Sequence, residues 1–207
     1  MDINRRSFAC AMSATAAAVL AGCGKEGLDR AVVADLKAAH NGESNASAKY
    51  AFFAGKCQEA GYLSVAALFR AASFAENIHA GRHAKVLAQY GVEAKAVVKP
   101  AVWTDVSAAL KEAIKGETYE FTGMYPGFIK TAGDKRVDAA VHSFTHAMEA
   151  EKVHAEYYAA ALADLDGWKA AGKTFYVCGV CGFTTNDGSV STCPYCAAPK
   201  SKFQTFA

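Results

Sequence analysis

The chain has 207 residues, which is enough for one substantial hydrophobic core and a small accessory module. Its 22 basic and 20 acidic residues give a formal net charge of +2, so it lacks the strongly basic balance of a nucleic-acid-binding protein, and we expect no nucleic-acid partner. Abundant alanine favours helices, and the four prolines and scattered β-branched residues argue against an all-β fold.

The first 23 residues have the pattern of an export signal. Arg5 and Arg6 resemble a twin-arginine motif, and the apolar run over residues 8–20 is shorter than the roughly 20 residues of a membrane span. A Leu-Ala-Gly-Cys sequence that ends at Cys23 resembles a bacterial lipobox. We therefore expect export to the periplasmic side and a lipid anchor at Cys23. The alternatives are an uncleaved hydrophobic anchor or a misassigned start in a cytoplasmic protein.

Four amphipathic stretches fill the middle of the chain, each with the spacing of apolar side chains that is typical of a packed helix. They cover about residues 29–61, 62–90, 104–132 and 134–165. Gly91 is a suitable stop for the second helix, and Thr104 is the expected N-cap of the third. Pro126 lies inside the third stretch and predicts a local irregularity there.

Residues 92–103 do not continue the helical pattern, since Val97, Val98 and Pro100 favour extended chain. Two short-looped helix pairs joined by one longer crossover have the connectivity of a ferritin-like bundle. We therefore expect an all-α, ferritin-like four-helix bundle over residues 28–166. A linker over residues 167–174 follows, and residues 175–207 are too few to form a stable core without a metal or a covalent link.

Acidic residues and histidines recur on the faces of these helices that should point inward. The candidates are Glu43 on the first helix, Glu76 and His79 on the second, Glu117 and Glu120 on the third, and Glu151 and His154 on the fourth. Residues three apart lie on one helical face, so each pair can reach the same ion. Buried carboxylates would repel one another and lose their hydration unless cations compensate them.

A single Glu-x-x-His motif is weak support for a metal, and a lone inward Glu43 is more often a surface residue or an ion-pair partner. Here two such motifs, which begin at Glu76 and Glu151, each follow an inward glutamate on the preceding helix. This order suggests a duplicated helical hairpin that donates half of the site in each copy. It matches the ligand pattern of dinuclear carboxylate bundles, so we predict a dinuclear metal site.

The other histidines and the lone cysteine of the bundle are less informative. His142 and His146 point away from the apolar stripe and should be solvated. His40 and His83 lie one turn from candidate ligands, either as groups that support the ligands or as ordinary polar residues near the bundle end. Cys57 lies on the inner stripe and is most simply a small buried hydrophobe.

The C-terminal region contains two Cys-x-x-Cys pairs, Cys178 with Cys181 and Cys193 with Cys196, separated by eleven residues. An even set of cysteines in an exported protein also suits disulfides. The regular spacing instead favours four thiolates around one tetrahedral ion. Iron and zinc both fit such a site, but iron would carry one electron and zinc would be redox-inert.

Taken together, these motifs resemble the rubrerythrin family over about residues 30–206. The matching stretches are Asn-Gly-Glu-Ser-Asn-Ala at 41–46, Ala-Glu-Asn-Ile-His-Ala at 75–80, Gly-Glu-Thr-Tyr-Glu-Phe and Met-Tyr-Pro within 116–126, Ala-Glu-Lys-Val-His at 150–154, and both cysteine pairs. The resemblance implies a ferritin-like di-iron domain followed by a rubredoxin-like domain over residues 175–207.

The resemblance also assigns roles to the candidate ligands of an Fe–O–Fe type centre. It implies that Glu76 and Glu151 bridge the irons, that Glu43, Glu117 and His154 are terminal ligands, and that Glu120 and His79 alternate on one iron as its oxidation state changes. Tyr50 and Tyr125 match tyrosines of the family's catalytic site. The four-cysteine iron would relay electrons to the di-iron site, often between the subunits of a homodimer.

The implied reaction is the two-electron reduction of hydrogen peroxide to water, with electrons from an unidentified donor. Two alternatives stay open, a ferroxidase that handles iron and an electron-transfer or iron-binding module without peroxidase turnover. The family is usually cytoplasmic, so the export signal is a departure that puts the usual cytoplasmic donors in doubt.

Overall fold

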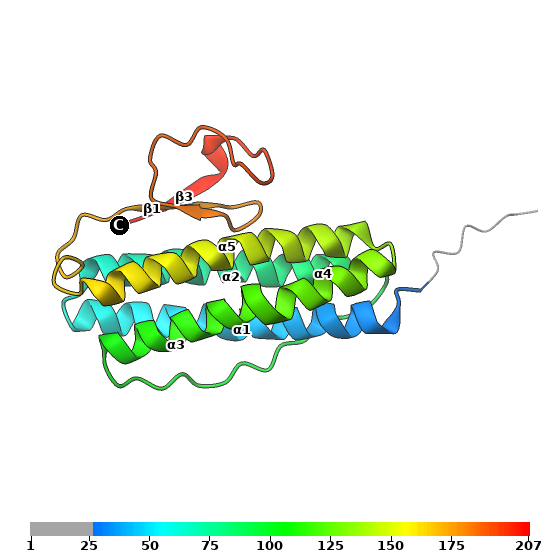
Figure 1. Cartoon of the computed structure of the whole chain (residues 1–207), viewed down its shortest axis with the longest axis horizontal. Helices are drawn as coiled ribbons and strands as arrows, with labels where there is room; N and C mark the ends of the chain where they lie inside the picture. Colours follow the sequence, from blue (N-terminus) through cyan, green and yellow to red (C-terminus); the bar gives the residue numbers. More distant parts are fainter. Residues whose placement is uncertain (1–26) are drawn as a thin grey trace, which may run out of the picture.

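The structure is a computed structural model that describes residues 27–207 (Figure 1). The long helices form a bundle, and a small strand-containing domain packs on one side of it. The predicted export signal and the cysteine proposed to carry a lipid lie outside the described residues. None of the helices in the described part of the chain is long and apolar enough to cross a membrane.

The bundle consists of four long helical rods, the third of which is interrupted. The elements are α1 (Arg30–Glu59), α2 (Leu63–Ala88), α3 (Val106–Tyr119), the π-helix η1 (Glu120–Met124), α4 (Tyr125–Asp134) and α5 (Asp138–Ala163). The N-cap of α1 is Asp29, whose carboxylate accepts a hydrogen bond from the Ala31 amide at 2.8 Å. Gly91 follows α2 with a φ of 72°, a value that suits glycine at the end of a helix.

Two predicted boundaries differ from the structure. Asp105, not Thr104, is the N-cap of α3, because its carboxylate accepts a hydrogen bond from the Ala108 amide at 2.8 Å. The last helix begins at Asp138 rather than near residue 134, since Arg136 adopts a φ of 55° and turns the chain between the two rods.

The irregularity predicted from Pro126 is confirmed as the π-helix η1, which lies directly before α4. Within it the Tyr125 amide donates to the carbonyl of Glu120, five residues back. Pro126 occupies the first turn of α4, where its missing N–H interrupts the regular helical hydrogen-bond pattern.

The crossover between α2 and α3 runs along the outside of the bundle (Figure 1). Two asparagines of α1 hold it in place through its backbone. Asn41 accepts from the Val97 amide at 2.8 Å, while Asn45 accepts from the Lys99 amide at 2.9 Å and donates to the Val97 carbonyl at 3.0 Å. These bonds give an extended segment the partners that a sheet would otherwise supply.

The bundle interior contains two apolar clusters. One includes Tyr50, Phe53, Leu68, Phe69, Leu110 and Tyr158, and the other includes Val32, Leu36, Leu87, Tyr125 and Phe144. On α1 the second cluster extends to Ala39 and the first begins at Ala46, so Glu43 falls between them. The same gap recurs on the other long helices, and the predicted ligands occupy it.

The C-terminal domain contains three short strands, β1 (Phe175–Cys178), β2 (Thr184–Thr185) and β3 (Phe203–Phe206), with the short 3₁₀ helix η2 (Lys200–Lys202) before the last. They form an antiparallel sheet in the order β2-β1-β3. The sheet packs on α2 and α5, where Phe175 and Val177 join the apolar cluster of the bundle. Phe206 lies against Phe74 with ring centroids 5.5 Å apart.

Candidate metal centres

Six of the seven predicted bundle ligands meet in the gap between the two apolar clusters. Two groups of side chains there each have ligand atoms within 4.8 Å of one another. One group contains Glu43, Glu76, His79 and Glu151, and the other contains Glu76, Glu117, Glu151 and His154. All six side chains are buried, with an exposed fraction of 1% or less. Glu76 and Glu151 belong to both groups, so the geometry offers two adjacent cation positions that share these two carboxylates.

Glu120 is the predicted ligand that the structure places outside both groups. It is the first residue of the π-helix and is only partly buried. One of its carboxylate oxygens lies beside Gly42 on α1, 4.0 Å from where a Cβ would stand. His79 lies inside a group and Glu120 outside it, so only one of the two residues predicted to alternate is in the ligand position.

The orientation of the two histidines is the one that metal ligands need. The Nδ1 atom of His79 lies 2.9 Å from Glu76 Oε2 and 3.1 Å from Glu151 Oε1. The Nδ1 atom of His154 lies 3.0 Å from Glu151 Oε2 and 3.3 Å from Glu76 Oε1. In both rings Nδ1 therefore points at the shared carboxylates, and Nε2 is left to contact the surroundings.

The electrostatics of the pocket show why cations fit it. Burial, followed by the charge of neighbouring carboxylates, raises the pKa of Glu43, Glu117 and Glu120 well above the usual value. Burial opposes the charged form of each histidine, but the carboxylates around them raise the pKa of His79 to about 10 and that of His154 to about 9. Without metal the pocket therefore holds extra protons.

Several buried oxygens of the pocket also make no hydrogen bond of good geometry within the described part of the chain, although three of them lie 3.0–3.3 Å from a histidine Nδ1 atom. They are Glu43 Oε2, Glu76 Oε1, Glu117 Oε2 and both carboxylate oxygens of Glu151. Leaving so many acceptors without partners is costly, and hard cations are the ligands that carboxylate oxygens suit. The residues present therefore fit a dinuclear metal centre.

Two tyrosines hydrogen-bond to candidate ligands from opposite sides. Tyr50 donates to Glu117 Oε1 at 2.7 Å, and Tyr125 donates to Glu43 Oε1. Both rings are fully packed in the interior, with exposed fractions of 1% and 0%. These bonds fix the direction of the two carboxylates, so both tyrosines lie beside the predicted ligands.

His83 has a larger part in this region than the sequence indicates. The reading of His83 as an ordinary polar residue near the bundle end is wrong, because its ring is 0% exposed and bonds to two side chains. Its Nε2 lies 3.2 Å from Tyr125 Oη, and its Nδ1 lies 2.9 Å from Ser143 Oγ. His142 is exposed as expected, whereas His146 is partly buried and accepts a hydrogen bond from Arg82 at 2.8 Å.

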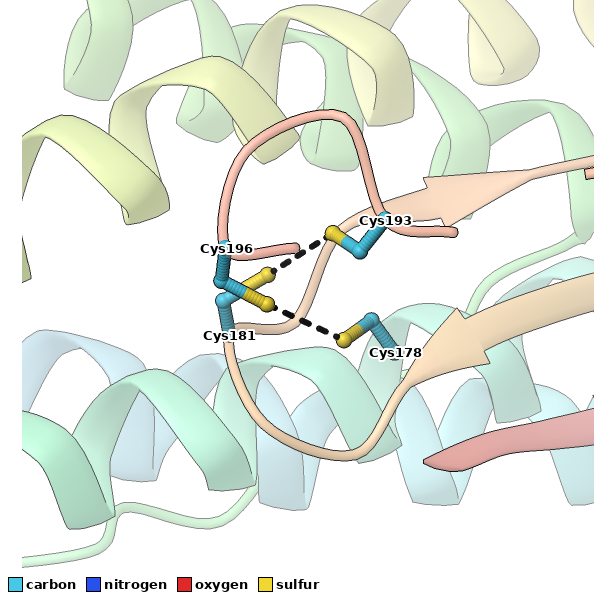
Figure 2. A group of neighbouring side chains, drawn as sticks. All are labelled: Cys178, Cys181, Cys193 and Cys196. Atoms are coloured by element: carbon cyan, nitrogen blue, oxygen red, sulfur yellow. Dashed lines mark hydrogen bonds between the residues drawn. The ribbon is translucent and has the colours of Figure 1, made fainter. Parts of the chain in front are cut away.

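The four C-terminal cysteines point their sulfur atoms toward a common centre (Figure 2). The sulfurs of Cys178 and Cys196 are 3.6 Å apart, and those of Cys181 and Cys193 are 3.5 Å apart. These distances are too long for disulfides and close to the roughly 3.8 Å edge of a tetrahedron with metal–sulfur bonds of about 2.3 Å. The pattern therefore fits four thiolates around one ion.

The two cysteine turns have the same backbone design. The residue after the second cysteine of each pair has a positive φ, 85° at Gly182 and 57° at Ala197. The amides of these residues donate to the carbonyls of Cys178 and Cys193 at 2.9 and 3.0 Å. Hydrogen bonds from Cys181 and from nearby amides lower the pKa of Cys178 to about 5, which favours the thiolate form that metals bind.

The first cysteine turn rests directly on the outer side of the bundle site. Gly182 lies so close to His79 that an added Cβ would overlap the Nε2 atom of the ring. Thr184 Oγ1 lies 2.9 Å from His154 Nε2. Each candidate histidine ligand therefore has one nitrogen toward the carboxylates and the other toward the cysteine domain.

Metal binding to the bundle should release protons, because the groups with raised pKa values must lose them to bind cations. Up to five protons per site are available, from Glu43, Glu117, Glu120, His79 and His154. Titration of the metal-free chain with zinc in weak buffer, followed by a pH indicator, measures them. The Glu76→Ala chain serves as control, since it keeps the cysteine site. Equal release from the two chains would contradict this account.

The same groups set the pH dependence of stability of the metal-free chain. The raised pKa of each of the five groups means that the folded chain holds its protons more tightly than the unfolded chain. Above neutral pH, where the lowered pKa values of Glu76 and His83 no longer act in the opposite direction, the free energy of unfolding should therefore fall as pH rises. The two histidine contributions are lost as pH passes through about 9 and about 10. Urea unfolding at several pH values tests this, and metal-loaded protein should lack the decline.

Comparison with known proteins supports both parts of this description. The family model for rubrerythrin matches residues 35–162, and the model for the rubrerythrin rubredoxin-like domain matches residues 176–204. Nigerythrin from Nitratidesulfovibrio vulgaris is 38% identical over 174 residues, which cover 83% of this chain and 85% of that protein. Rubrerythrin-2 from Clostridium acetobutylicum is 37% identical over 181 residues, which cover 85% of this chain and 97% of that protein.

Solved structures agree with this assignment. The fully reduced, all-ferrous form of nigerythrin superposes with a TM-score of 0.78 at 36% identity and covers 89% of this chain and 91% of that one. Mycobacterium tuberculosis bacterioferritin has a TM-score of 0.63 at 17% identity, covering 69% of this chain and 90% of that one, which shows the shared fold alone.

The predicted ferritin-like bundle with its small C-terminal cysteine domain is confirmed, and the residues for a carboxylate di-iron centre and a four-cysteine centre are both present. The chain belongs to the rubrerythrin family.

Proposed function

We propose that this protein reduces hydrogen peroxide to water at a di-iron centre in the bundle, with electrons supplied through iron in the four-cysteine site. The coarser statement, that it is a rubrerythrin-family di-iron protein with a rubredoxin-like domain, follows from the comparisons above. The peroxidase activity rests on the arrangement of the two centres.

We propose roles for the ligands that agree with their positions. Bridging by Glu76 and Glu151 is supported by their membership of both ligand groups. Glu43 and Glu117 would be terminal carboxylates, each held in direction by a tyrosine hydroxyl. The terminal nitrogen ligands would be Nδ1 of His79 and His154, and Glu120 would replace His79 in the other oxidation state.

One observation carries the proposal, the contact between the cysteine domain and the histidines of the bundle site. Gly182 is bonded to Cys181 on one side and lies against His79 Nε2 on the other. This gives an electron a short route from a sulfur ligand to an imidazole ligand within one chain. A site that only oxidises ferrous iron has no need of such a route, so the contact favours an enzyme that receives electrons.

The remaining chemistry follows from the pocket. The irons would supply the two electrons that break the O–O bond, one from each ferrous ion. The buried carboxylates and the surrounding apolar clusters exclude bulk water, which keeps partly reduced oxygen species in place. Two protons must also reach the oxygen atoms, and Tyr50 and Tyr125 are the hydroxyl groups that contact the carboxylates.

Stopped-flow mixing of the fully reduced chain with peroxide tests this function. Both centres should be reoxidised rapidly, with the absorption of the four-cysteine iron returning as electrons leave it. In the Cys181→Ser chain the bundle irons should react once and then receive no further electrons. Reoxidation of the bundle with an inert cysteine centre, together with oxygen uptake on ferrous iron addition, would support a ferroxidase instead.

The Gly182→Ala substitution examines the contact itself, since its methyl group would overlap His79 Nε2 and must push the two domains apart. The chain keeps all four cysteines, and its visible spectrum reports whether their iron is intact. Transfer between the centres should slow by at least about tenfold, which corresponds to about 1.4 kcal/mol in the barrier. An unchanged rate would contradict the proposed route. Gly91→Ala, at a glycine with a similar positive φ where an added Cβ meets no atom within 4 Å, is the control.

We further propose that the protein is exported and anchored through a lipid on Cys23, and that it works as a homodimer with an electron donor outside the cytoplasm. Export and the anchor are supported by the arginine pair and the Leu-Ala-Gly-Cys sequence, and the homodimer is what the family resemblance implies. Labelled fatty acid should enter the native chain and not the Cys23→Ser chain when each is expressed in a bacterium. Equal labelling, or recovery of the native chain in the cytoplasm, would overturn the anchor.

A further inference from the structure

A line of hydrogen-bonded side chains leads from the bundle site to the surface between α2 and α5. It consists of Tyr125, His83 and Ser143, which belong to three different helices and are all buried, with exposed fractions of 2% or less. Tyr125 bonds to Glu43 at the inner end. Ser143 forms the outer end and lines a surface cavity of about 230 Å³ together with Arg82, Lys85 and His142.

The hydrogen bonds of this line all run in one direction. Tyr125 donates its proton to Glu43, so its oxygen must accept from His83 Nε2, 3.2 Å away. That leaves His83 Nδ1 without a proton, and it accepts from the Ser143 hydroxyl at 2.9 Å. Each group thus donates to the next one inward, and Ser143 remains able to accept from water in the cavity.

The surroundings of His83 keep its ring neutral, as this pattern requires. Burial, and then the nearby charges of His79, Arg82 and His40, lower its pKa well below the usual value, against a smaller opposing effect of Glu76. Phe144 packs on the ring with centroids 5.2 Å apart. A neutral imidazole can take a proton on one nitrogen while it gives one from the other, which a charged imidazolium cannot do.

We propose that His83 is a positioning residue that passes protons from the surface cavity through Tyr125 to Glu43, at the edge of the bundle site. The proposal rests on the peroxide reduction proposed above, because that reaction consumes two protons for each peroxide.

In one passage of this relay each bond that breaks is matched by one that forms. The Ser143 hydroxyl proton moves to His83 Nδ1, the Nε2 proton moves to the Tyr125 oxygen, and the Tyr125 proton moves to Glu43. Ser143 regains a proton from the cavity, so one proton has been carried inward and no electron has moved. Once Glu43 has given this proton to a peroxide oxygen, rotation of the two hydroxyls and a change of tautomer at His83 restore the starting arrangement.

The His83→Gln chain separates a relay from a structural role. The glutamine amide that replaces the imidazole can still donate toward Tyr125 and accept from Ser143, but an amide does not readily pass a proton through. Reoxidation of the reduced chain by peroxide should slow by roughly 10²-fold, the low end of the effect of positioned proton transfer, and should acquire a larger solvent isotope effect. A rate within about twofold of the native chain, with an unchanged isotope effect, would overturn the proposal.

Two further variants sharpen the comparison. Reoxidation of the His83→Ala chain by peroxide should also be slow. Added imidazole should restore part of this rate by carrying protons, whereas a molecule that only filled the space would not. His146→Gln is the control, because His146 is a partly buried histidine that bonds to Arg82, at 2.8 Å, outside the line. An equal loss in His146→Gln, or no rescue by imidazole, would count against the relay.

A measurement without peroxide keeps the test independent of the proposed function. The ¹⁵N spectrum of histidine-labelled, zinc-loaded chain reports the state of the ring, and His83→Gln identifies its signals. His83 should be neutral with its proton on Nε2. A proton on Nδ1, or a charged ring at about pH 7, would refute the line even in a folded and active protein. If the native chain does not react with peroxide while the ring state is as expected, the peroxidase assignment fails and the hydrogen-bonded line stands.

Discussion

The structure depends on one constraint, the burial of four carboxylates and two imidazoles in a single pocket at the middle of a helical bundle. Each ion would cost several kcal/mol to bury alone, and the carboxylates repel one another. Proton uptake relieves part of this in the metal-free chain, which is why the pKa values of Glu43 and Glu117 are raised. Two shared cations offset both the cost of burial and the repulsion, because they neutralise the carboxylates and are bound by the oxygens that lack other partners.

The rest of the bundle is organised around that pocket. The apolar clusters on either side supply the stability that the polar centre cannot, and they position the four helices so that the ligands face one another. The π-helix at Glu120 belongs to the same arrangement. It changes the helical register just after Glu117, so that Glu117 faces the pocket while Glu120 lies at its edge. A carboxylate at the edge has room to move that a fully packed one lacks.

The small C-terminal domain contacts the pocket from outside the bundle. Its cysteine turn covers the outer nitrogens of the two histidines, through Gly182 and Thr184. A glycine is required at this point for two reasons, the positive φ of the turn and the closeness of His79. The electron route through Gly182 and the hydrogen-bonded line through His83 and Tyr125 reach the pocket at different ligands, the first at His79 and the second at Glu43.

Much of this could be predicted from the sequence, because ligand residues follow short rules. The Glu-x-x-His spacing at Glu76 and Glu151 and the paired cysteines depend on local helix and turn geometry, which the chain itself displays. Contacts between distant segments cannot be predicted from such local geometry. Nothing near His83 in the sequence indicates that Tyr125 and Ser143 meet it, although a histidine four residues after His79 lies on the same helical face. Likewise, no local pattern at the two asparagines of α1 indicates that they hold the crossover.

The proposed chemistry requires that the pocket hold two metal ions shared by Glu76 and Glu151. The most direct measurement is an anomalous-difference map at the iron absorption edge, from crystals of the iron-loaded chain. We expect two neighbouring peaks between these carboxylates and a third among the cysteine sulfurs, with the bundle pair lost in the Glu76→Ala chain. A folded, iron-loaded protein that shows the cysteine peak but none within the bundle would contradict this expectation.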